Sequence, residues 1–250
     1  MAAISNALTA YGGLKVFCST FFVFTDYMKG AMRLSALMKL PVIYVMTHDS
    51  IGVGEDGPTH QPVEHLAAVR SIPNFIDFRP ADANETAAGW YTAITSTSSP
   101  TCLILSRQNL PVLDINGKSA LNGAYILLDS KSDVPQIILI ATGSEVHITL
   151  EAGKALQAEG IDARVVSMPS WAIFERQSEE YKESVLPSSV ENRIAVEAAS
   201  SFGWHKYVGL KGKIISIDSF GASSPADKLF KHFGFTVENI MAKSRELLNK

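Results

Sequence analysis

The chain has 250 residues, 46% of them hydrophobic, and a net charge of −3, a composition typical of a globular protein of one or two domains. The weak negative charge disfavours binding to nucleic acid, and no apolar run reaches the roughly 20 residues needed to cross a bilayer. The only cysteines are Cys18 and Cys102, so a disulfide framework is excluded and a reducing cytoplasm is the expected location.

The chain opens with a helical pattern. Met1, Ile4, Leu8 and Tyr11 fall on one helical stripe that ends at Gly12. A helix normally begins at a capping residue, yet this stripe is already under way at Met1. The pattern indicates either residues missing upstream or a frayed first helix, and by itself it favours the frayed helix.

Short apolar runs then alternate with helical patterns along the chain. The runs that predict strands are 42–46, 75–78, 101–105, 136–141, 163–166, 193–197 and 213–217. The patterns that predict helices are 63–70, 83–95, 144–159, 225–232 and 237–249. Ser144 is expected to cap its helix and Gly160 to end it.

This alternation predicts an α/β fold with two consecutive domains, each a mostly parallel sheet with helices on both faces. We predict domains at 1–112 and 122–250, joined by a linker at 113–121. Residues 1–112 hold only 7 Lys/Arg and 8 Asp/Glu, against 15 and 17 in 113–250. The first domain is therefore either covered by a partner or built around a large core.

Polar and titratable residues concentrate in residues 47–62 (THDSIGVGEDGPTHQP), directly after a predicted strand. A long loop at the carboxyl end of a strand is a common ligand site in α/β proteins. Three chemistries compete for this loop. His48, Asp49 and Ser50 are the residue types of a hydrolase triad, but adjacent side chains diverge and no Gly-x-Ser-x-Gly turn is present, so we exclude that class.

The second chemistry is dinucleotide binding. Residues 52–57 match Gly-x-Gly-x-x-Gly, and Asp77 stands 20 residues further on. Pro58, however, follows where a helix should begin, and Glu55 and Asp56 would repel a pyrophosphate. The context contradicts this motif.

The third chemistry is a polar substrate site. Imidazoles and a carboxylate held by glycines can bind sugar hydroxyls and move protons. His48, Asp56 and His60 lack a recognised metal-ligand spacing, so we predict no metal residues. Arg107 follows a predicted strand at the same sheet edge and suits either a phosphate or a structural ion pair.

Three aromatic residues precede this loop. Phe21, Phe24 and Tyr27 are three apart, so on a helix they would be near neighbours. They could stack on a flat heterocycle or simply belong to the core, and spacing alone favours the core.

Together these segments resemble the transketolase family over essentially the whole chain. The resemblance rests on TFFVFTDY (20–27), the loop 47–62, RPAD (79–82), LSRQNLP (105–111), ATGSEV (141–146), RVVSMP (164–169) and FGAS (220–223). It implies transfer of a two-carbon ketol unit between sugar phosphates in the pentose phosphate pathway. It also implies thiamine diphosphate, Mg²⁺ or Ca²⁺, and a homodimer whose active sites lie between subunits.

The resemblance also implies roles for individual residues. His48 and His60 match imidazoles that bind substrate hydroxyls and assist proton transfer. The residues that match the aromatic pocket for the cofactor's pyrimidine are Phe21, Phe24 and Tyr27, with Phe24 the most direct contact. Asp56 matches the carboxylate that holds the 2-hydroxyl of the sugar, and Arg107 the arginine that grips its phosphate.

The sequence departs from the family pattern in two ways. The family's diphosphate-binding domain with its Gly-Asp-Gly metal motif is absent, and residues 54–57 (GEDG) are not that motif. Met1 matches the Met of the family's Arg-Glu-x-Ala-Met segment, so the glutamate that activates the cofactor falls just before it. We therefore expect this chain alone to bind the cofactor very weakly and to be inactive.

Other interpretations stay open. The chain could be a non-catalytic or split-subunit partner of a separate diphosphate-binding chain, or belong to another thiamine enzyme such as a dihydroxyacetone synthase. Residues 55–61 (EDGPTHQ) disfavour a 2-oxoacid dehydrogenase β-subunit. In the second domain, Trp204 and His205 are expected to be structural.

Overall fold

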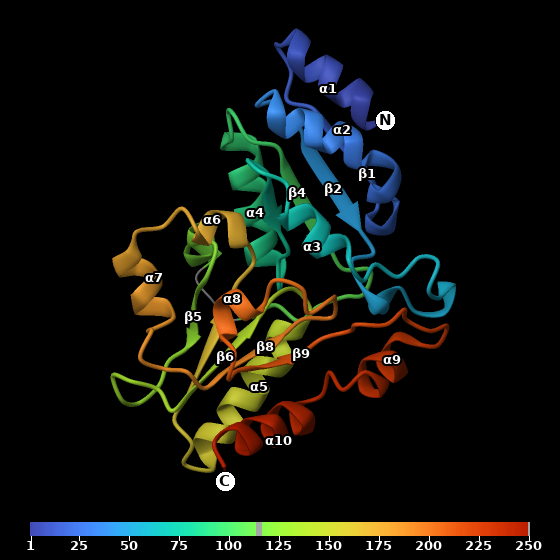
Figure 1. Cartoon of the computed structure of the whole chain (residues 1–250). Coiled ribbons are helices and arrows are strands. Elements are labelled where there is room, and N and C mark those ends of the chain that lie inside the picture. Colours follow the sequence, from blue (N-terminus) through green and yellow to red (C-terminus); the bar gives the residue numbers. More distant parts are fainter. Residues whose placement is uncertain (114–116, 250) are drawn as a thin grey trace.

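The computed structural model describes residues 1–113 and 117–249 and contains two sheets, one after the other along the chain (Figure 1). Residues 114–116 of the predicted linker lie outside the described residues, and the rest of that segment contributes to the 3₁₀ helix η3 (Gly117–Asn122). The two-domain α/β architecture with mostly parallel sheets is confirmed.

The first sheet has four parallel strands in the order β1-β2-β4-β3. The strands are β1 (Phe17–Phe21), β2 (Ile43–Thr47), β3 (Ile76–Phe78) and β4 (Thr101–Leu105). Alternate side chains enter two cores, with Tyr44 and Met46 on one face and Ile43 and Val45 on the other. The helices packed with this sheet are α1 (Ala2–Tyr11), α2 (Thr25–Leu37), α3 (His65–Arg70) and α4 (Ala83–Thr95).

The second sheet has five strands in the order β5-β7-β6-β8-β9, and its edge strand β5 runs antiparallel to β7. The strands are β5 (Tyr125–Leu128), β6 (Ile137–Ala141), β7 (Ala163–Ser167), β8 (Arg193–Val196) and β9 (Lys213–Ile215). Helices α5 (Glu145–Ala158), α9 (Ala226–His232) and α10 (Val237–Leu247) share a core with one face. Helices α6 (Trp171–Phe174), α7 (Glu179–Val185) and α8 (His205–Val208) share a core with the other.

Two edge strands, β1 and β5, were not predicted from the sequence. Strand β1 alternates between exposed and buried residues and contains Ser19 and Thr20, so it lacks the continuous apolar run of the central strands. Ser144 stands at the N-cap position of α5 as predicted, but its hydroxyl donates to the Glu145 carboxylate at 2.5 Å and makes no capping bond with a backbone N–H. Gly160 does end α5, with a φ of 84°.

Helix α1 exposes the apolar stripe found in the sequence. Ile4 and Tyr11 are 65% and 92% exposed, whereas the buried side of the helix carries Ala2, Ser5 and Asn6. The Asn6 amide donates a hydrogen bond to the backbone oxygen of Ala31 in α2 at 2.8 Å. Polar and small residues thus attach α1 to the fold, and its apolar side chains point away from it.

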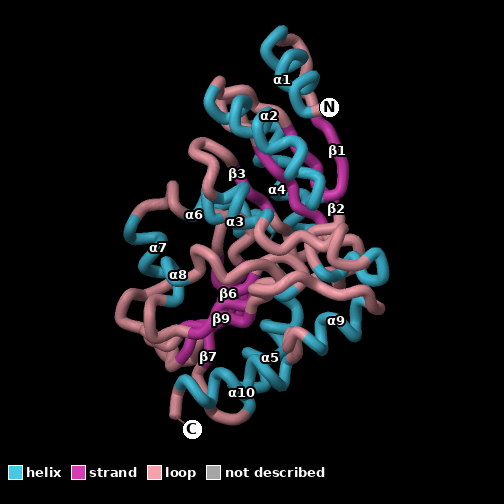
Figure 2. The backbone as a smooth tube through the Cα atoms, turned by 45° about the vertical axis from the view of Figure 1, so that its right-hand side comes forward, coloured by secondary structure: helices cyan, strands magenta, loops and turns pink. Residues whose placement is uncertain are grey.

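The two sheets pack against one another through shared cores. Ile51 and Ala81 from the first part of the chain belong to the core of the second sheet. Tyr125 and Ile173 from the second part belong to a core of the first. The tube view shows loops gathered where the two halves meet (Figure 2).

Both cysteines, Cys18 and Cys102, are buried and unpaired with each other. Within the described residues, the helices are too short or too polar to cross a membrane.

Candidate functional site

Three neighbouring strands of the first sheet end at the same level. Phe21 at the end of β1 pairs with Thr47 at the end of β2, which pairs in turn with Leu105 at the end of β4. His48 and Arg107 follow within two residues of these ends. Carboxyl ends of parallel strands form the edge where ligands bind in open α/β sheets. The register therefore brings together side chains that are far apart in the sequence.

The predicted aromatic and histidine residues form one continuous cluster. The Phe21 ring stacks on the His48 imidazole with their centroids 3.6 Å apart, and Phe24 lies 6.1 Å from Phe21. His60 meets Phe24 edge-on at 5.7 Å. Tyr27 lies 6.2 Å from Phe24 and is 87% exposed. Such a cluster can hold a flat ring on its aromatic side and a polar ligand on its imidazole side.

The spacing of the three aromatics suggested that they would be neighbours on one helix, but the structure places them on three different elements. Phe21 ends strand β1, Phe24 closes the 3₁₀ helix η1 (Phe22–Phe24), and Tyr27 stands in the first turn of α2. The backbone pairing of Phe21 with β2 holds its ring at the strand end. Pairing between strands, rather than helical spacing, places this ring over His48.

The electrostatics of His48 show which charged residues surround it. Burial lowers the pKa of its imidazole, and the positive charge of Arg107 lowers this pKa further. The negative charge of Asp56 raises the pKa of His48, whereas His60 lowers it. The other three predicted polar site residues thus lie within electrostatic range of His48. The lowered pKa favours the neutral imidazole, the form that accepts a proton.

We call residues 48–61 the site loop. At its start, His48 has a φ of 62°, in the left-handed region that costs a non-glycine residue conformational energy. The His48 Nδ1 lies 2.9 Å from Thr47 Oγ1, which leaves Nε2 for a ligand. The loop continues as the 3₁₀ helix η2 (Ile51–Asp56), with a positive φ at Gly54 and Gly57.

Arg107 and Asp56 are both exposed at this edge and can therefore contact a ligand. The neighbour of Arg107, Gln108, packs against the site loop at Gly52. A Cβ at Gly52 would overlap Gln108 Oε1, so a larger residue at this position would displace the Gln108 side chain. This close approach explains one glycine of the apparent dinucleotide motif.

The structure supports exclusion of the other two chemistries. Asp49 is 2% exposed and accepts hydrogen bonds from Ser50 Oγ at 3.1 Å and from Arg79 Nε at 2.8 Å, so it orients no imidazole. Asp77 pairs with Arg70 at 3.1 Å and accepts the backbone N–H of Ala172 at 3.0 Å. Its carboxylate is therefore engaged and cannot bind a ribose.

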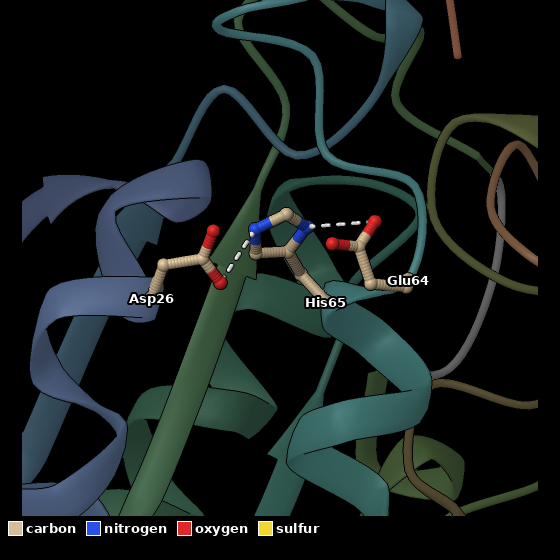
Figure 3. A group of neighbouring side chains, drawn as sticks. All are labelled: Asp26, Glu64 and His65. Carbon is tan, nitrogen blue, oxygen red and sulfur yellow. Dashed lines mark ion pairs between the residues drawn. The ribbon is translucent and has the colours of Figure 1, made fainter.

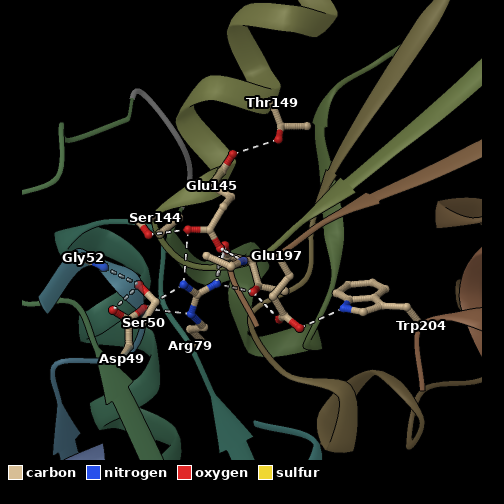
Figure 4. A network of polar contacts seen from close by, with 12 residues as sticks. Asp49, Ser50, Gly52, Arg79, Ser144, Glu145, Thr149, Glu197 and Trp204 are labelled. Atoms are coloured by element: carbon tan, nitrogen blue, oxygen red, sulfur yellow. Dashed lines mark hydrogen bonds and ion pairs between the residues drawn. The ribbon is translucent and has the colours of Figure 1, made fainter. Parts of the chain in front are cut away.

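A buried ionic network lies beside the site loop, and the sequence analysis did not identify it (Figure 4). Arg79, 1% exposed, donates to Asp49 at 2.8 Å and to Glu145 Oε2 at 2.5 Å. Glu197 accepts from Arg70 Nη1 and Nη2, both at 2.8 Å. Burial opposes the charges, but the neighbouring carboxylates keep the pKa of Arg79 above its usual range, and the two arginines lower the pKa of Glu197.

The network could have been suspected from the strand patterns. Arg79, Glu145 and Glu197 each follow an apolar strand run directly or within a few residues. Charged residues in such positions are buried only when paired. Trp204, predicted to be structural, is fully buried and donates its indole N–H to Glu197 at 2.8 Å. His205 is exposed.

One further group of metal-ligand side chains occurs in the described residues, next to the aromatic cluster (Figure 3). The His65 imidazole lies between two carboxylates, with Nε2 3.2 Å from Asp26 and Nδ1 3.8 Å from Glu64. One ligand atom from each of the three side chains lies within 4.8 Å of the other two. The contact joins the first turn of α2 to the start of α3.

The chain matches two protein-family models. Residues 1–112 match the transketolase pyrimidine-binding domain, and residues 123–236 match the transketolase-like C-terminal domain. Among curated relatives, it is 52% identical to a transketolase of Geobacillus stearothermophilus and 53% identical to one of Bacillus subtilis. All of this chain is covered, but only 38% of each relative, so the chain spans little more than a third of their length.

Solved structures that resemble this chain are also transketolases. The transketolase of Leishmania mexicana matches with a TM-score of 0.94 and 45% identity over 99% of this chain and 36% of that one. A split-gene transketolase, described as an inactive β4 tetramer, matches with a TM-score of 0.81 and 26% identity. That match covers 98% of this chain and 80% of the other chain.

Proposed function

The chain belongs to the transketolase family of thiamine-diphosphate-dependent transferases, and we propose that it supplies the substrate- and pyrimidine-binding half of a transketolase active site. The reaction is transfer of a two-carbon ketol unit between sugar phosphates, as in the pentose phosphate pathway of the cytoplasm. As part of this proposal we keep the predicted domain bounds, residues 1–112 and 122–250.

One observation carries this proposal: a continuous cluster of aromatic rings and imidazoles at the carboxyl edge of a parallel sheet. His48 stacks on Phe21, and His60 meets Phe24 edge-on. The charge of Arg107 acts on His48 from the same edge. The cluster thus offers a ring-binding surface, two imidazoles and a cation within one site.

The polar residues have distinct roles in this proposal. Arg107 holds the phosphate of the sugar through its exposed guanidinium. Asp56 accepts a hydrogen bond from the 2-hydroxyl of the sugar. His48 and His60 bind neighbouring hydroxyls. The neutral His48 imidazole accepts the hydroxyl proton through Nε2 as the substrate carbon–carbon bond is cleaved, and it returns the proton to the new hydroxyl as the bond to the acceptor forms.

The aromatic residues fit the pyrimidine ring of the cofactor. Phe21, Phe24 and Tyr27 form an aromatic surface that is open to solvent at Tyr27. The chemistry that the cofactor supplies when bound is a carbon nucleophile for the sugar carbonyl.

Exposed apolar surface supports a site completed by a partner. Large apolar side chains on α1, α2 and the segment between them are open to solvent, among them Tyr11 at 92%, Tyr27 at 87% and Leu37 at 67%. Apolar surface of this kind commonly marks an interface. We propose a homodimer in the complete enzyme, with the diphosphate-binding domain of one subunit facing this surface of the other.

Ketol transfer by the full-length enzyme, or by this chain with a complementing diphosphate-binding chain, tests the site. We expect His48→Ala and His60→Ala to lower the rate by roughly 100-fold or more, the usual contribution of an acid–base group. His147→Ala and His232→Ala are matched controls outside the cluster and should keep the rate within about twofold. Equal losses in all four variants would refute the assignment.

Calorimetric titration tests the cofactor proposal. Most of the charge of thiamine diphosphate lies on its diphosphate, so this chain alone should bind it very weakly, with or without magnesium. Tight, magnesium-dependent binding to the 250 residues would contradict the proposal. It would also contradict the expectation that the chain alone is inactive.

A second candidate function is a separately encoded subunit. The match to a split-gene transketolase chain, 80% of which this chain covers, favours this alternative. Mixing the chain with a diphosphate-binding subunit should then restore ketol transfer, and the mass of the natural protein should equal that of the 250 residues. A larger natural protein would exclude this candidate.

A further inference from the structure

The site loop is attached to the second half of the chain at three points. Arg79, in the first half, carries the first attachment, because it bonds both Asp49 and Glu145. The Gln61 side chain makes the second and Ser223 makes the third. We propose that residues 123–249 act as a positioning element for the site loop, an inference that rests on the proposed function.

The first attachment fixes the residue after His48. Arg79 Nη2 lies 2.7 Å from Asp49 Oδ2, and Arg79 Nη1 donates to Glu145 Oε2 at 2.5 Å and to Thr142 Oγ1 at 2.9 Å. Figure 4 shows the guanidinium between Asp49, from the site loop, and Glu145, at the start of α5. A Cβ at Gly143 would lie 2.6 Å from the Arg79 guanidinium carbon, so the second half encloses this side chain tightly.

The second attachment fixes the residue after His60. Gln61 is 2% exposed, and its Nε2 donates to the backbone oxygens of Gly54 at 2.8 Å and Ala222 at 2.9 Å. One side chain thus ties the end of the loop both to its middle and to the second half. A Cβ at Gly221 would overlap Gln61 Oε1, so the 221–222 backbone approaches the loop as closely as glycine permits.

The third attachment fixes the residue before Asp56. The Ser223 hydroxyl donates to the backbone oxygen of Glu55 at 2.5 Å. Helix α9 begins three residues later, at Ala226, and lies beside η2. Each of the three predicted polar residues of the loop therefore has a directly adjacent residue held by the second half.

These attachments bear on the backbone conformation at the start of the loop. The left-handed φ of His48 is sustained only where surrounding contacts impose it. Sub-ångström placement of acid–base groups strongly affects rate. Residues 123–249 thus act on the reaction through the loop without contacting the substrate.

Ser223→Ala is the most direct test, because this exposed serine can change without unfolding the protein. Its matched control is Ser184→Ala, which removes an equally exposed hydroxyl bonded to the Tyr181 backbone oxygen at 2.7 Å, in α7. Ser223→Thr keeps the hydroxyl and should restore wild-type behaviour.

We expect Ser223→Ala to accelerate amide hydrogen exchange in the site loop of this chain and to leave its unfolding midpoint unchanged. The amides of Gly57 and His60, which bond Gly54 and Gly57 oxygens at 3.1 and 3.0 Å, report on the loop. With a complementing diphosphate-binding chain, kcat/KM for the sugar phosphate should fall roughly three- to tenfold, the weight of one hydrogen bond. Ser184→Ala should change neither quantity.

The results of these experiments can separate the positioning inference from the proposed function and from a merely structural role. Unchanged loop exchange and unchanged kcat/KM in Ser223→Ala, with ketol transfer still lost in His48→Ala, would overturn positioning alone. Ketol transfer that survives His48→Ala would overturn the proposed function, and with it any role of positioning in that reaction. A lowered unfolding midpoint with unchanged loop exchange would show a merely structural role.

Discussion

The two halves of the chain present different surfaces to solvent. Among the described residues, thirteen of the seventeen large apolar side chains that are exposed belong to residues 1–112, including those of α1. The surface ion pairs between acids and lysine or arginine lie in the second half, such as Lys211–Glu191 at 2.6 Å and Arg245–Glu159 at 2.6 Å. The first half carries the site and an apolar surface, whereas the second carries charges suited to contact with water.

This difference agrees better with the proposed partner surface than with a large core as the explanation for the few charges in the first half. A large core alone would leave the helices with polar outer faces, but α1 exposes Ile4, Leu8 and Tyr11. The low charge therefore accompanies uncovered apolar surface. The halves meet through a buried ionic network rather than through apolar side chains alone.

The largest effect is expected where the halves meet. Arg79→Met leaves the carboxylates of Asp49 and Glu145 buried without their cation, which should cost about 3–5 kcal/mol of unfolding free energy. The matched control, Lys211→Met, breaks an exposed pair with Glu191 and should cost less than about 1 kcal/mol. Urea unfolding measures both, and equal costs would refute the network's importance.

A smaller effect concerns Glu85, another buried acid where the halves meet. It accepts hydrogen bonds from Tyr125 OH at 2.8 Å and Ser167 Oγ at 2.5 Å, and burial raises its pKa from 4.5 to about 6. A raised carboxyl pKa stabilises the fold below pH 4.5, and this contribution is lost as pH rises through 6.

Comparison with Glu85→Gln isolates this contribution. From well below pH 4.5 to well above pH 6, the unfolding free energy of the wild type relative to that of the variant should fall by about 2 kcal/mol in total, at about 1.4 kcal/mol per pKa unit. Urea titrations at several pH values give this difference. A difference that stays constant across the range would contradict the assignment.

The smallest effect is expected for an isoleucine on the exposed stripe of α1, and a buried isoleucine in the second half serves as its comparison. Ile4→Ala, on the exposed stripe of α1, should change the unfolding free energy by about 0.5 kcal/mol or less. Ile138→Ala, in fully buried β6, should cost about 2–5 kcal/mol. Denaturant unfolding at low protein concentration compares them. A large cost at Ile4 would show that this face is already covered, for instance by a second copy of the chain.

Most central strands could be predicted because their sequences carry the signal themselves. Residues 101–105 form β4 as predicted, and the predicted run 163–166 forms β7 with one more residue. Buried parallel strands are apolar on both faces, so a continuous run marks them. Edge strand β1 lacks this double burial and has a mixed pattern, whereas β5 is a short apolar run that the prediction omitted.

The site was partly predictable for a similar reason. The residue types of the loop, with His48, Asp56 and His60, pointed to a polar substrate, and the family resemblance supplied candidate roles. The roles of these residues remain predictions. The stack of Phe21 on His48 was not predictable, because it depends on the register between β1 and β2.

The sequence by itself determined the α/β class, the order of most elements and the residues of the candidate site, since local periodicity and motif chemistry are written within short segments. Only the tertiary structure decided which side of α1 faces solvent and which acids neutralise Arg79. It also decided that Glu145, Ala222 and Ser223 hold the site loop. These contacts join residues up to 168 positions apart, as in Ser223 and Glu55, and such pairings follow from packing and strand register rather than from local sequence.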